Sequence, residues 1–209
     1  MNNKNFSEKE ANSMNDFSSI TVTRRGKEEE LVVNNPTSYP LIGKGIQGAV
    51  FKLTEDRCVK IFLKPKNVKK EKEAMIKGQG LPFMPKFFES GPNYIIMEYI
   101  DGPSLRDYLK EQGTISESIT QQLVSMKKEM KRLGFTNLDR CVIRHIFVDN
   151  QQVLKVVDHA NSYDWKPIPV RLLDSLSELG LIDPFLQQVK VLDSELYSEW
   201  KNFLSKPRK

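Results

Sequence analysis

The sequence predicts an α+β fold with two lobes, in which an antiparallel-sheet N-lobe precedes a short, mainly helical C-lobe. Short runs typical of β-strands, including the alternating run at 49–53, occur between residues 41 and 100 on both sides of one expected helix. Apolar residues then recur every three to four positions between residues 116 and 134, which is the period of an α-helix. The expected organisation is an unstructured segment over 1–19, an N-lobe over 20–100 and a C-lobe over 101–209.

Composition restricts the class of protein. The 209 residues are 39% hydrophobic and 28% charged, as in an ordinary globular protein. The net charge of +5 permits contact with nucleic acid but does not indicate it, because the basic residues fall on expected helix faces. No apolar run reaches the roughly 18 residues of a membrane span, and the polar start lacks a signal-peptide pattern. The two cysteines are too few for a disulfide framework or a metal site, so we expect a cytoplasmic protein.

The N-lobe is expected to begin with a hairpin. Residues 1–19 are rich in Asn, Ser and charged residues and have little to bury, so we expect them to lack fixed structure. Residues 20–33 contain two alternating runs on either side of a basic turn at 24–27. This pattern predicts two strands that pair onto the sheet, and Pro36 ends the segment.

A glycine-rich turn follows the expected hairpin. Gly43, Gly45 and Gly48 lie between two expected strands, and glycine, which has no Cβ atom, lets backbone N–H groups approach phosphate oxygens closely. Lys60 lies on the next strand, where it can reach a phosphate under the turn. The alternation after Gly48 excludes the helix of a dinucleotide-binding loop, and the lack of a Gly-Lys-Ser/Thr run excludes a Walker A loop. A phosphate-covering turn and an ordinary hairpin with a solvated lysine remain.

Periodicity and turn residues predict the rest of the N-lobe. A helix over residues 64–77 ends at Gly78, and Val68, Met75 and Ile76 form its thin buried stripe. Two strands then surround a Ser-Gly-Pro-Asn turn at 90–93.

In the C-lobe, Ser104 and Ser116 are expected to cap two helices. The second helix repeats its apolar residues as far as Gly134, and this face is core rather than a ligand surface. A hairpin over 146–157 then ends in Asp158. Further apolar repeats predict helices near the end of the chain, at 172–179 and 192–203.

The order of these motifs resembles the protein kinase-like superfamily. The glycine-rich turn, followed by Val50 and Lys60, is similar to the GxGxxGxV and VAIK signatures, and Asp158-His159-Ala160 stands in the place of Asp-Phe-Gly. The resemblance covers residues 39–161. Because 51 residues follow Asp158 and contain no Ala-Pro-Glu motif, the chain looks like the small atypical bacterial-type Ser/Thr kinases of the RIO and lipopolysaccharide kinase-like groups.

The resemblance implies that ATP is bound by the N-lobe. The three glycines and Val50 would cover the phosphates, and Lys60 would be held on them by a glutamate of the following helix. Glu71 is preferred for this role, because Met75 four residues later supplies an apolar contact on the same face. Glu73 is the alternative.

The resemblance also implies an adenine pocket and a metal site. Met97 would back the adenine, and the main chain of Glu98 and the residues as far as Ile100 would hydrogen-bond its edge. Asp158 would bind the Mg²⁺ that bridges the nucleotide phosphates, a role suited to an oxygen ligand.

The catalytic loop departs from the kinase pattern. His145 fills the position of the metal-binding Asn, although Mg²⁺ prefers oxygen to imidazole nitrogen. Arg140 fills the position of the catalytic Asp, and Asp139 lies one residue away. Two interpretations follow: Asp139 accepts the proton of the substrate hydroxyl, or this role is lost and the protein only binds nucleotide.

These residues favour an ATP- and Mg²⁺-dependent atypical serine/threonine protein kinase with an unidentified protein substrate or partner. The alternative is a pseudokinase that acts as a nucleotide-binding regulatory or scaffold protein. A small-molecule phosphotransferase is a third hypothesis, because the short C-lobe leaves little platform for a protein substrate.

Overall fold

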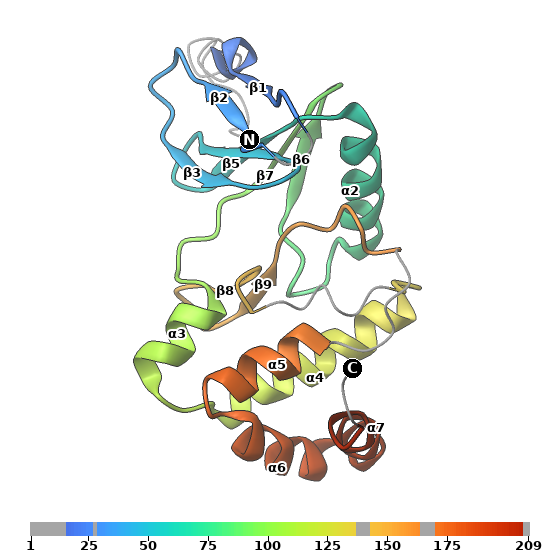
Figure 1. The fold of residues 1–209 in the computed structure, drawn as a ribbon. Coiled ribbons are helices and arrows are strands. Elements are labelled where there is room, and N and C mark those ends of the chain that lie inside the picture. Colours follow the sequence, from blue (N-terminus) through green and yellow to red (C-terminus); the bar gives the residue numbers. More distant parts are fainter. Residues whose placement is uncertain (1–15, 27–28, 137–142, 164–169, 207–209) are drawn as a thin grey trace, which may run out of the picture. The chain divides into compact units, whose positions relative to one another are not determined.

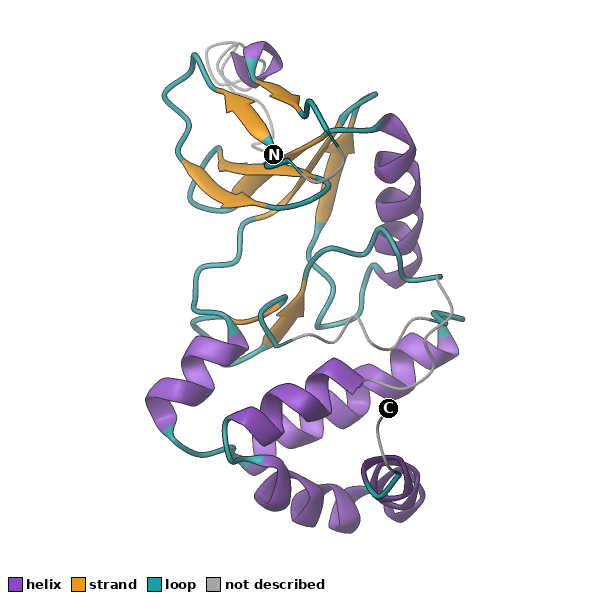
Figure 2. Cartoon of the chain, viewed as in Figure 1, coloured by secondary structure: helices purple, strands orange, loops and turns teal. Residues whose placement is uncertain are grey.

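The computed structural model describes residues 16–26, 29–136, 143–163 and 170–206. The chain divides into two compact units, which we call the sheet unit (residues 1–72 and 86–99) and the helical unit (residues 73–85 and 100–209). Figures 1 and 2 show most of the strands in the first unit and most of the helices in the second. The predicted α+β class, with an antiparallel sheet before a mainly helical part, is confirmed. Residues 73–85, expected in the N-lobe, group with the helical unit instead.

The sheet unit is built on five antiparallel strands in the order β3-β4-β5-β7-β6. Strand β5 is central and is buried on both faces from its second residue, because Val59 and Ile61 face the core while Lys60 faces the opposite way. The strands are β3 (Leu41–Lys44), β4 (Gly48–Lys52), β5 (Arg57–Phe62), β6 (Phe87–Ser90) and β7 (Tyr94–Glu98).

The N-terminal segment packs on this sheet as a separate layer. A 3-10 helix, η1 (Asp16–Ser19), precedes β1 (Thr21–Thr23) and β2 (Val32–Asn34), which pair only with each other among the described residues. The predicted hairpin is present, but the prediction that it pairs onto the main sheet is wrong. Phe17, Ile20 and Leu31 are buried in one cluster with residues of β4, β5 and β7.

The expectation that residues 16–19 lack structure is wrong. Phe17 is 4% exposed, and its ring meets the edge of Tyr94 at 4.9 Å between centroids. Burying one such side chain contributes about 1.5–3 kcal/mol, and Ile20 and Leu31 add to it in the same cluster. The first 15 residues lie outside the described part of the chain.

Helix α2 (Pro65–Gly78) continues from the sheet unit into the helical unit. Val68 and Met75 are buried as expected, but Ile76 is 51% exposed. Each helical residue turns by about 100°, so Ala74 and Met75 face inward and the next residue faces solvent. Gly78 is the last residue of the helix, and a side chain there would displace Met84, because a Cβ atom would lie 2.3 Å from its Cε.

The helical unit contains five helices and a short hairpin among its described residues. Ser104 accepts a hydrogen bond from the amide of Asp107, and Ser116 from that of Ile119, so both predicted caps are confirmed. These elements are α3 (Leu105–Gln112), α4 (Glu117–Arg132), β8 (Ile146–Val148), β9 (Leu154–Val156), α5 (Val170–Glu178), α6 (Ile182–Leu192) and α7 (Ser194–Leu204).

The end of the chain holds one more helix than the sequence predicted. Asp193 ends α6 and also caps α7, because its carboxylate accepts the amide of Leu196 at 2.8 Å. Trp200 is fully buried and stacks on Phe185 with 5.5 Å between ring centroids. This contact joins α7 to α6, which in turn packs on α4.

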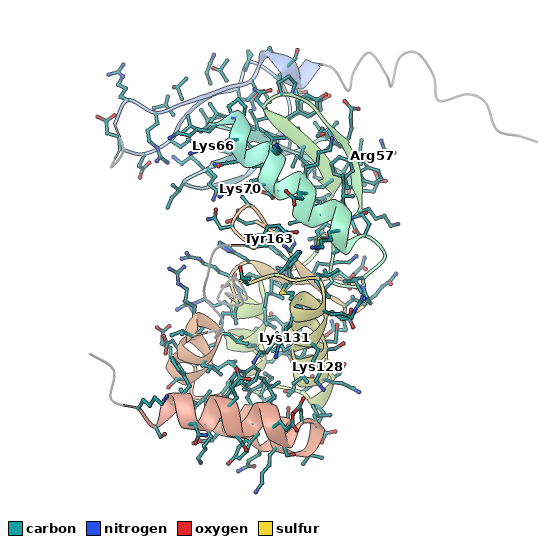
Figure 3. The ribbon with its side chains drawn as sticks, turned by 90° about the vertical axis from the view of Figure 1, so that its right-hand side faces the viewer. Arg57, Lys66, Lys70, Lys128, Lys131 and Tyr163 are labelled. Atoms are coloured by element: carbon teal, nitrogen blue, oxygen red, sulfur yellow. The ribbon has the colours of Figure 1, made fainter. Side chains whose placement is uncertain are left out.

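Many of the lysines lie on exposed helix faces. Lys66 and Lys70 are exposed on α2, and Lys128 and Lys131 are exposed on α4 (Figure 3). Lys128 pairs with Asp193 at 2.8 Å. None of the helices in the described ranges is both long and apolar enough to cross a membrane.

Cys58 is expected to resist alkylation in the folded protein. Its thiol is buried on β5, contacts the carbonyl of Glu98 at 3.6 Å, and burial raises its pKa to about 12. The reactive thiolate is therefore absent at pH 8. In a Cys141→Ser variant, which leaves Cys58 as the one thiol of the chain, iodoacetamide should label the protein in urea but not in buffer. Labelling in buffer at the rate of a free thiol would contradict this result.

Candidate functional site

A buried ion pair lies at the centre of the sheet unit. Lys60 is 7% exposed and Glu71 is 1% exposed, and Nζ of the lysine lies 2.6 Å from Oε2 of the glutamate. Lys60 sits on β5 between its register partners Val50 on β4 and Ile95 on β7. Of the two glutamates considered for this pairing, Glu71 makes it, whereas Glu73 is exposed. The pair is a charge-assisted hydrogen bond in surroundings with little water to screen it.

The three glycines of the turn between β3 and β4 have different surroundings. A Cβ atom on Gly48 would lie 2.1 Å from the carbonyl oxygen of Ile61, so β4 approaches β5 too closely for any side chain there. A Cβ on Gly43 would make an ordinary contact with Val50, and one on Gly45 would meet no atom within 4 Å. Gly48 is therefore required by packing, whereas Gly45 leaves open space at the turn.

Backbone hydrogen bonds close the turn. The amide of Gly45 donates to the carbonyl of Gly48 at 3.0 Å, and the amide of Leu63 donates to the carbonyl of Gln47 at 2.8 Å. Because the Gly45 amide donates within the turn, any hydrogen bonds to a phosphate would have to come from other amides of the turn. Ile46 at the tip is 79% exposed.

Alanine substitutions should separate these glycine roles. Gly48→Ala is expected to lower the free energy of unfolding by about 3 kcal/mol, because β4 and β5 must move apart. Gly45→Ala should change it by less than about 0.5 kcal/mol, because the added methyl group meets open space. Urea unfolding of both variants measures the difference. Equal stability of the two variants would show that the close approach of Gly48 to Ile61 is not a constraint.

The segment after β7 only partly fits the expected adenine contacts. Met97 is buried on β7, where it could back a ring. The amide of Glu98 already donates to the carbonyl of Lys86, and the amide of Tyr99 to the carbonyl of Asp56, both at 2.9 Å. An adenine would therefore have to take a main-chain N–H hydrogen bond from Ile100, and the expected main-chain contacts over residues 98–100 stay a prediction.

In the helical unit, the β8–β9 hairpin presents Asp158 on a strained turn. The amide of Val157 donates to the carbonyl of His145 at 2.9 Å, and Asp158 follows with φ of 66°. This left-handed conformation is uncommon for residues other than glycine, although Asp tolerates it better than most. The next residue, His159, is buried, with its Nε2 2.8 Å from the carbonyl of Val156. The buried histidine anchors the turn and leaves Asp158 half-exposed.

The second metal ligand and the base remain predictions. His145 is half-buried immediately before β8. Within the described ranges, no group of three or more His, Cys, Asp or Glu side chains is placed to hold a metal ion. A site built on Asp158 would therefore draw most of its oxygen ligands from phosphates and water, which is how Mg²⁺ is commonly bound. Asp139, the candidate base, lies outside the described residues.

Sequence reasoning missed two residues that contact the glycine-rich turn. Arg24 donates to the carbonyl of Ile46 at 2.7 Å, and Glu30 lies 3.1 Å from Nζ of Lys44. Both come from the N-terminal hairpin segment. The alternating runs on either side of residues 24–27 indicated a hairpin, but no local pattern indicates what its turn touches.

Comparisons with known proteins point to kinases. No protein-family model matches the chain. A Bacillus subtilis protein named "Putative serine/threonine-protein kinase YrzF" is 29% identical over 144 residues, which are 66% of each chain. A Caenorhabditis elegans protein named "Probable serine/threonine-protein kinase zyg-1" is 29% identical over 113 residues, which are 47% of this chain and 16% of that protein. The chain thus spans just under two thirds of the first relative and a small part of the second.

Among solved structures, Rad53 1-466 in complex with AMP-PNP matches with 20% sequence identity and a TM-score of 0.44. The match covers 58% of this chain and 38% of that one. The two similar sequences come from distant organisms, and both carry kinase names. Their similarity agrees with the order of the sequence motifs and with the mixed α+β fold. The chain is therefore similar to members of the protein kinase-like superfamily.

Proposed function

We propose that the chain is an atypical serine/threonine protein kinase that binds ATP with Mg²⁺ and transfers the γ-phosphoryl group to a hydroxyl. The observation that carries this proposal is the buried pair of Lys60 and Glu71 in the same unit as the glycine-rich turn. Both sequence relatives carry serine/threonine-protein kinase names, which supports the same class of acceptor.

Burial of the Lys60–Glu71 ion pair costs free energy that a purely structural role would not require. Two charges lose their hydration on burial, and well-packed apolar residues of the same size often stabilise a core at least as well. A lysine held by a carboxylate beside a phosphate-covering turn can neutralise the charge of phosphate oxygens. Phosphoryl transfer depends on this neutralisation and on positioning of the phosphates. In the proposed site, Glu71 fixes the direction of the Lys60 side chain, and the Lys60 ammonium contacts the phosphates.

The strained turn at Asp158 supports the metal-binding part of the proposal. A non-glycine residue with positive φ costs free energy and is found disproportionately at functional sites. The Asp158 carboxylate would hold the Mg²⁺ that supplies charge neutralisation at the phosphates. Met97 would lie behind the adenine, and Ile100 would donate to its edge.

A pseudokinase is the second candidate, and the catalytic loop favours it. Arg140 and His145 occupy the positions where the kinase signature has its catalytic Asp and metal-binding Asn. In that case the chain binds nucleotide and acts through a partner. Loss of the base alone slows phosphoryl transfer without removing the nucleotide site.

Phosphoryl transfer and nucleotide binding should be measured separately. Purified protein with Mg²⁺ and γ-labelled ATP should label itself or a generic protein substrate, and Asp139→Asn should strongly slow the labelling. Asp101→Asn, which changes an exposed carboxylate in the same way, is the matched control. Equal labelling by the Asp139→Asn variant would exclude Asp139 as the base.

A thermal shift assay with ATP gives the second measurement. ATP-dependent stabilisation without any label in the wild type would favour the pseudokinase. No stabilisation at millimolar ATP would contradict both candidate functions, because a ligand that binds the native state must raise its stability.

A further inference from the structure

Two side chains of the N-terminal hairpin segment hold the glycine-rich turn from outside. Nη2 of Arg24 donates to the carbonyl of Ile46 at 2.7 Å, and Oε2 of Glu30 lies 3.1 Å from Nζ of Lys44. The two contacts fall on the residues immediately before and after Gly45. The Arg24 contact restrains the backbone of the turn directly, whereas the exposed pair of Glu30 and Lys44 adds a weaker restraint through the Lys44 side chain.

The hairpin is itself attached to the core of the sheet unit. Phe17 and Ile20 precede β1 and Leu31 precedes β2, and all three are buried against β4, β5 and β7. Arg24 and Glu30 thus extend from a segment whose own position is fixed by apolar packing. A contact with such a segment restricts the turn more than a contact with a mobile chain end would.

Apart from the backbone hydrogen bonds donated by Gly45 and Leu63, the tip of the turn is open. No atom lies within 4 Å of a Cβ placed on Gly45, and Ile46 is 79% exposed. Glycine also loses more conformational entropy than other residues when it is ordered. A turn that had to become ordered only on binding would spend part of the binding free energy on that ordering.

The contact of Arg24 also sets the direction of a backbone donor. The peptide bond is planar and trans, so the N–H of Gln47 points opposite to the carbonyl of Ile46 in the same peptide group. Because Arg24 holds that carbonyl on the hairpin side, the Gln47 N–H is aimed away from the hairpin. An N–H fixed in this way is suited to donate to an anionic oxygen.

We propose that Arg24 and Glu30 are positioning residues that pre-order the glycine-rich turn and aim the Gln47 amide at the phosphates of a bound nucleotide. The part of this inference that concerns phosphates rests on the proposed nucleotide binding. The other part, that the hairpin restrains the glycine-rich turn, can be tested without any ligand.

Amide hydrogen exchange of the ligand-free protein tests whether the hairpin restrains the glycine-rich turn. Arg24→Ala should speed amide exchange in residues 43–48 by about threefold to tenfold, the effect of losing one hydrogen bond at an exposed position. Arg25→Ala removes the same charge from the neighbouring exposed position and should leave this exchange unchanged. Glu30→Gln should also speed amide exchange in residues 43–48, and Glu29→Gln is its control. Equal exchange in Arg24→Ala and Arg25→Ala would overturn the proposal.

The affinities for ATP and for adenosine test whether the ordered turn contributes to phosphate binding. Arg24→Ala should raise the Kd for ATP by about threefold to tenfold and leave the Kd for adenosine unchanged, because adenosine has no phosphates to meet the turn. Arg24→Lys, which keeps a cationic donor, should restore part of the ATP affinity. An unchanged Kd for ATP, or an equal loss for both ligands, would overturn the positioning role. If the wild type binds neither ligand, the proposed function fails and this consequence fails with it, while hydrogen exchange still decides whether the hairpin holds the turn.

Discussion

Glu71→Leu is expected to lower the free energy of unfolding by about 3–5 kcal/mol, because it leaves the Lys60 ammonium buried without its carboxylate. The double variant Lys60→Met/Glu71→Leu should recover most of this loss, since two apolar side chains of similar length can pack where the ion pair was. Urea unfolding of the wild type, both single variants and the double variant gives the coupling free energy directly.

The same four proteins separate stability from function. The double variant should be stable but should lose ATP-dependent stabilisation and phosphoryl transfer, because the phosphate-binding charge is gone. Glu73→Leu is the matched control, since Glu73 is exposed on the same helix, and it should change neither quantity appreciably. A double variant that kept full phosphoryl transfer would show that the pair is only structural. A Glu71→Leu variant as stable as the Glu73→Leu variant would show that the pair is not coupled in solution.

The elements set by local pattern could be predicted from the sequence. Strands β4 and β5 follow from alternation, and helix α4 follows from its apolar repeat and the Ser116 cap. The pairing of Lys60 with a glutamate of α2 was implied by the resemblance to protein kinases, and the apolar contact of Met75 on the same face favoured Glu71 over Glu73. For the strands, the helix and the choice between the two glutamates, the information lies within a few residues of the feature it predicts.

Features that depend on distant contacts could not be predicted in this way. The sequence around Phe17 is polar, and only the sheet face formed by later strands explains why that residue is buried. Nothing near Gly48 reveals that the carbonyl of Ile61 occupies the space of a side chain. The hold of Arg24 on Ile46 joins residues 22 positions apart across an exposed turn, where no apolar pattern exists to reveal it.

The conformation of Asp158 leads to a prediction in which two substitutions differ in stability but lose activity alike. With φ of 66°, a residue that carries a Cβ atom is strained by about 1–2 kcal/mol relative to glycine. Asp158→Gly should therefore be more stable to urea than Asp158→Ala by about 1 kcal/mol. Both variants should lose phosphoryl transfer by at least about a hundredfold, because neither keeps the carboxylate that would hold Mg²⁺.

Gln152 provides the matched control, because it has φ of 62° in the turn of the same β8–β9 hairpin and is exposed. Gln152→Gly should likewise be more stable than Gln152→Ala, but both should keep wild-type transfer. If Asp158→Gly and Gln152→Gly behave alike in transfer, the strain at Asp158 has no link to catalysis and the metal assignment is wrong. If only the Asp158 variants lose transfer, the carboxylate is what the strained turn presents, since the backbone change is the same at both positions.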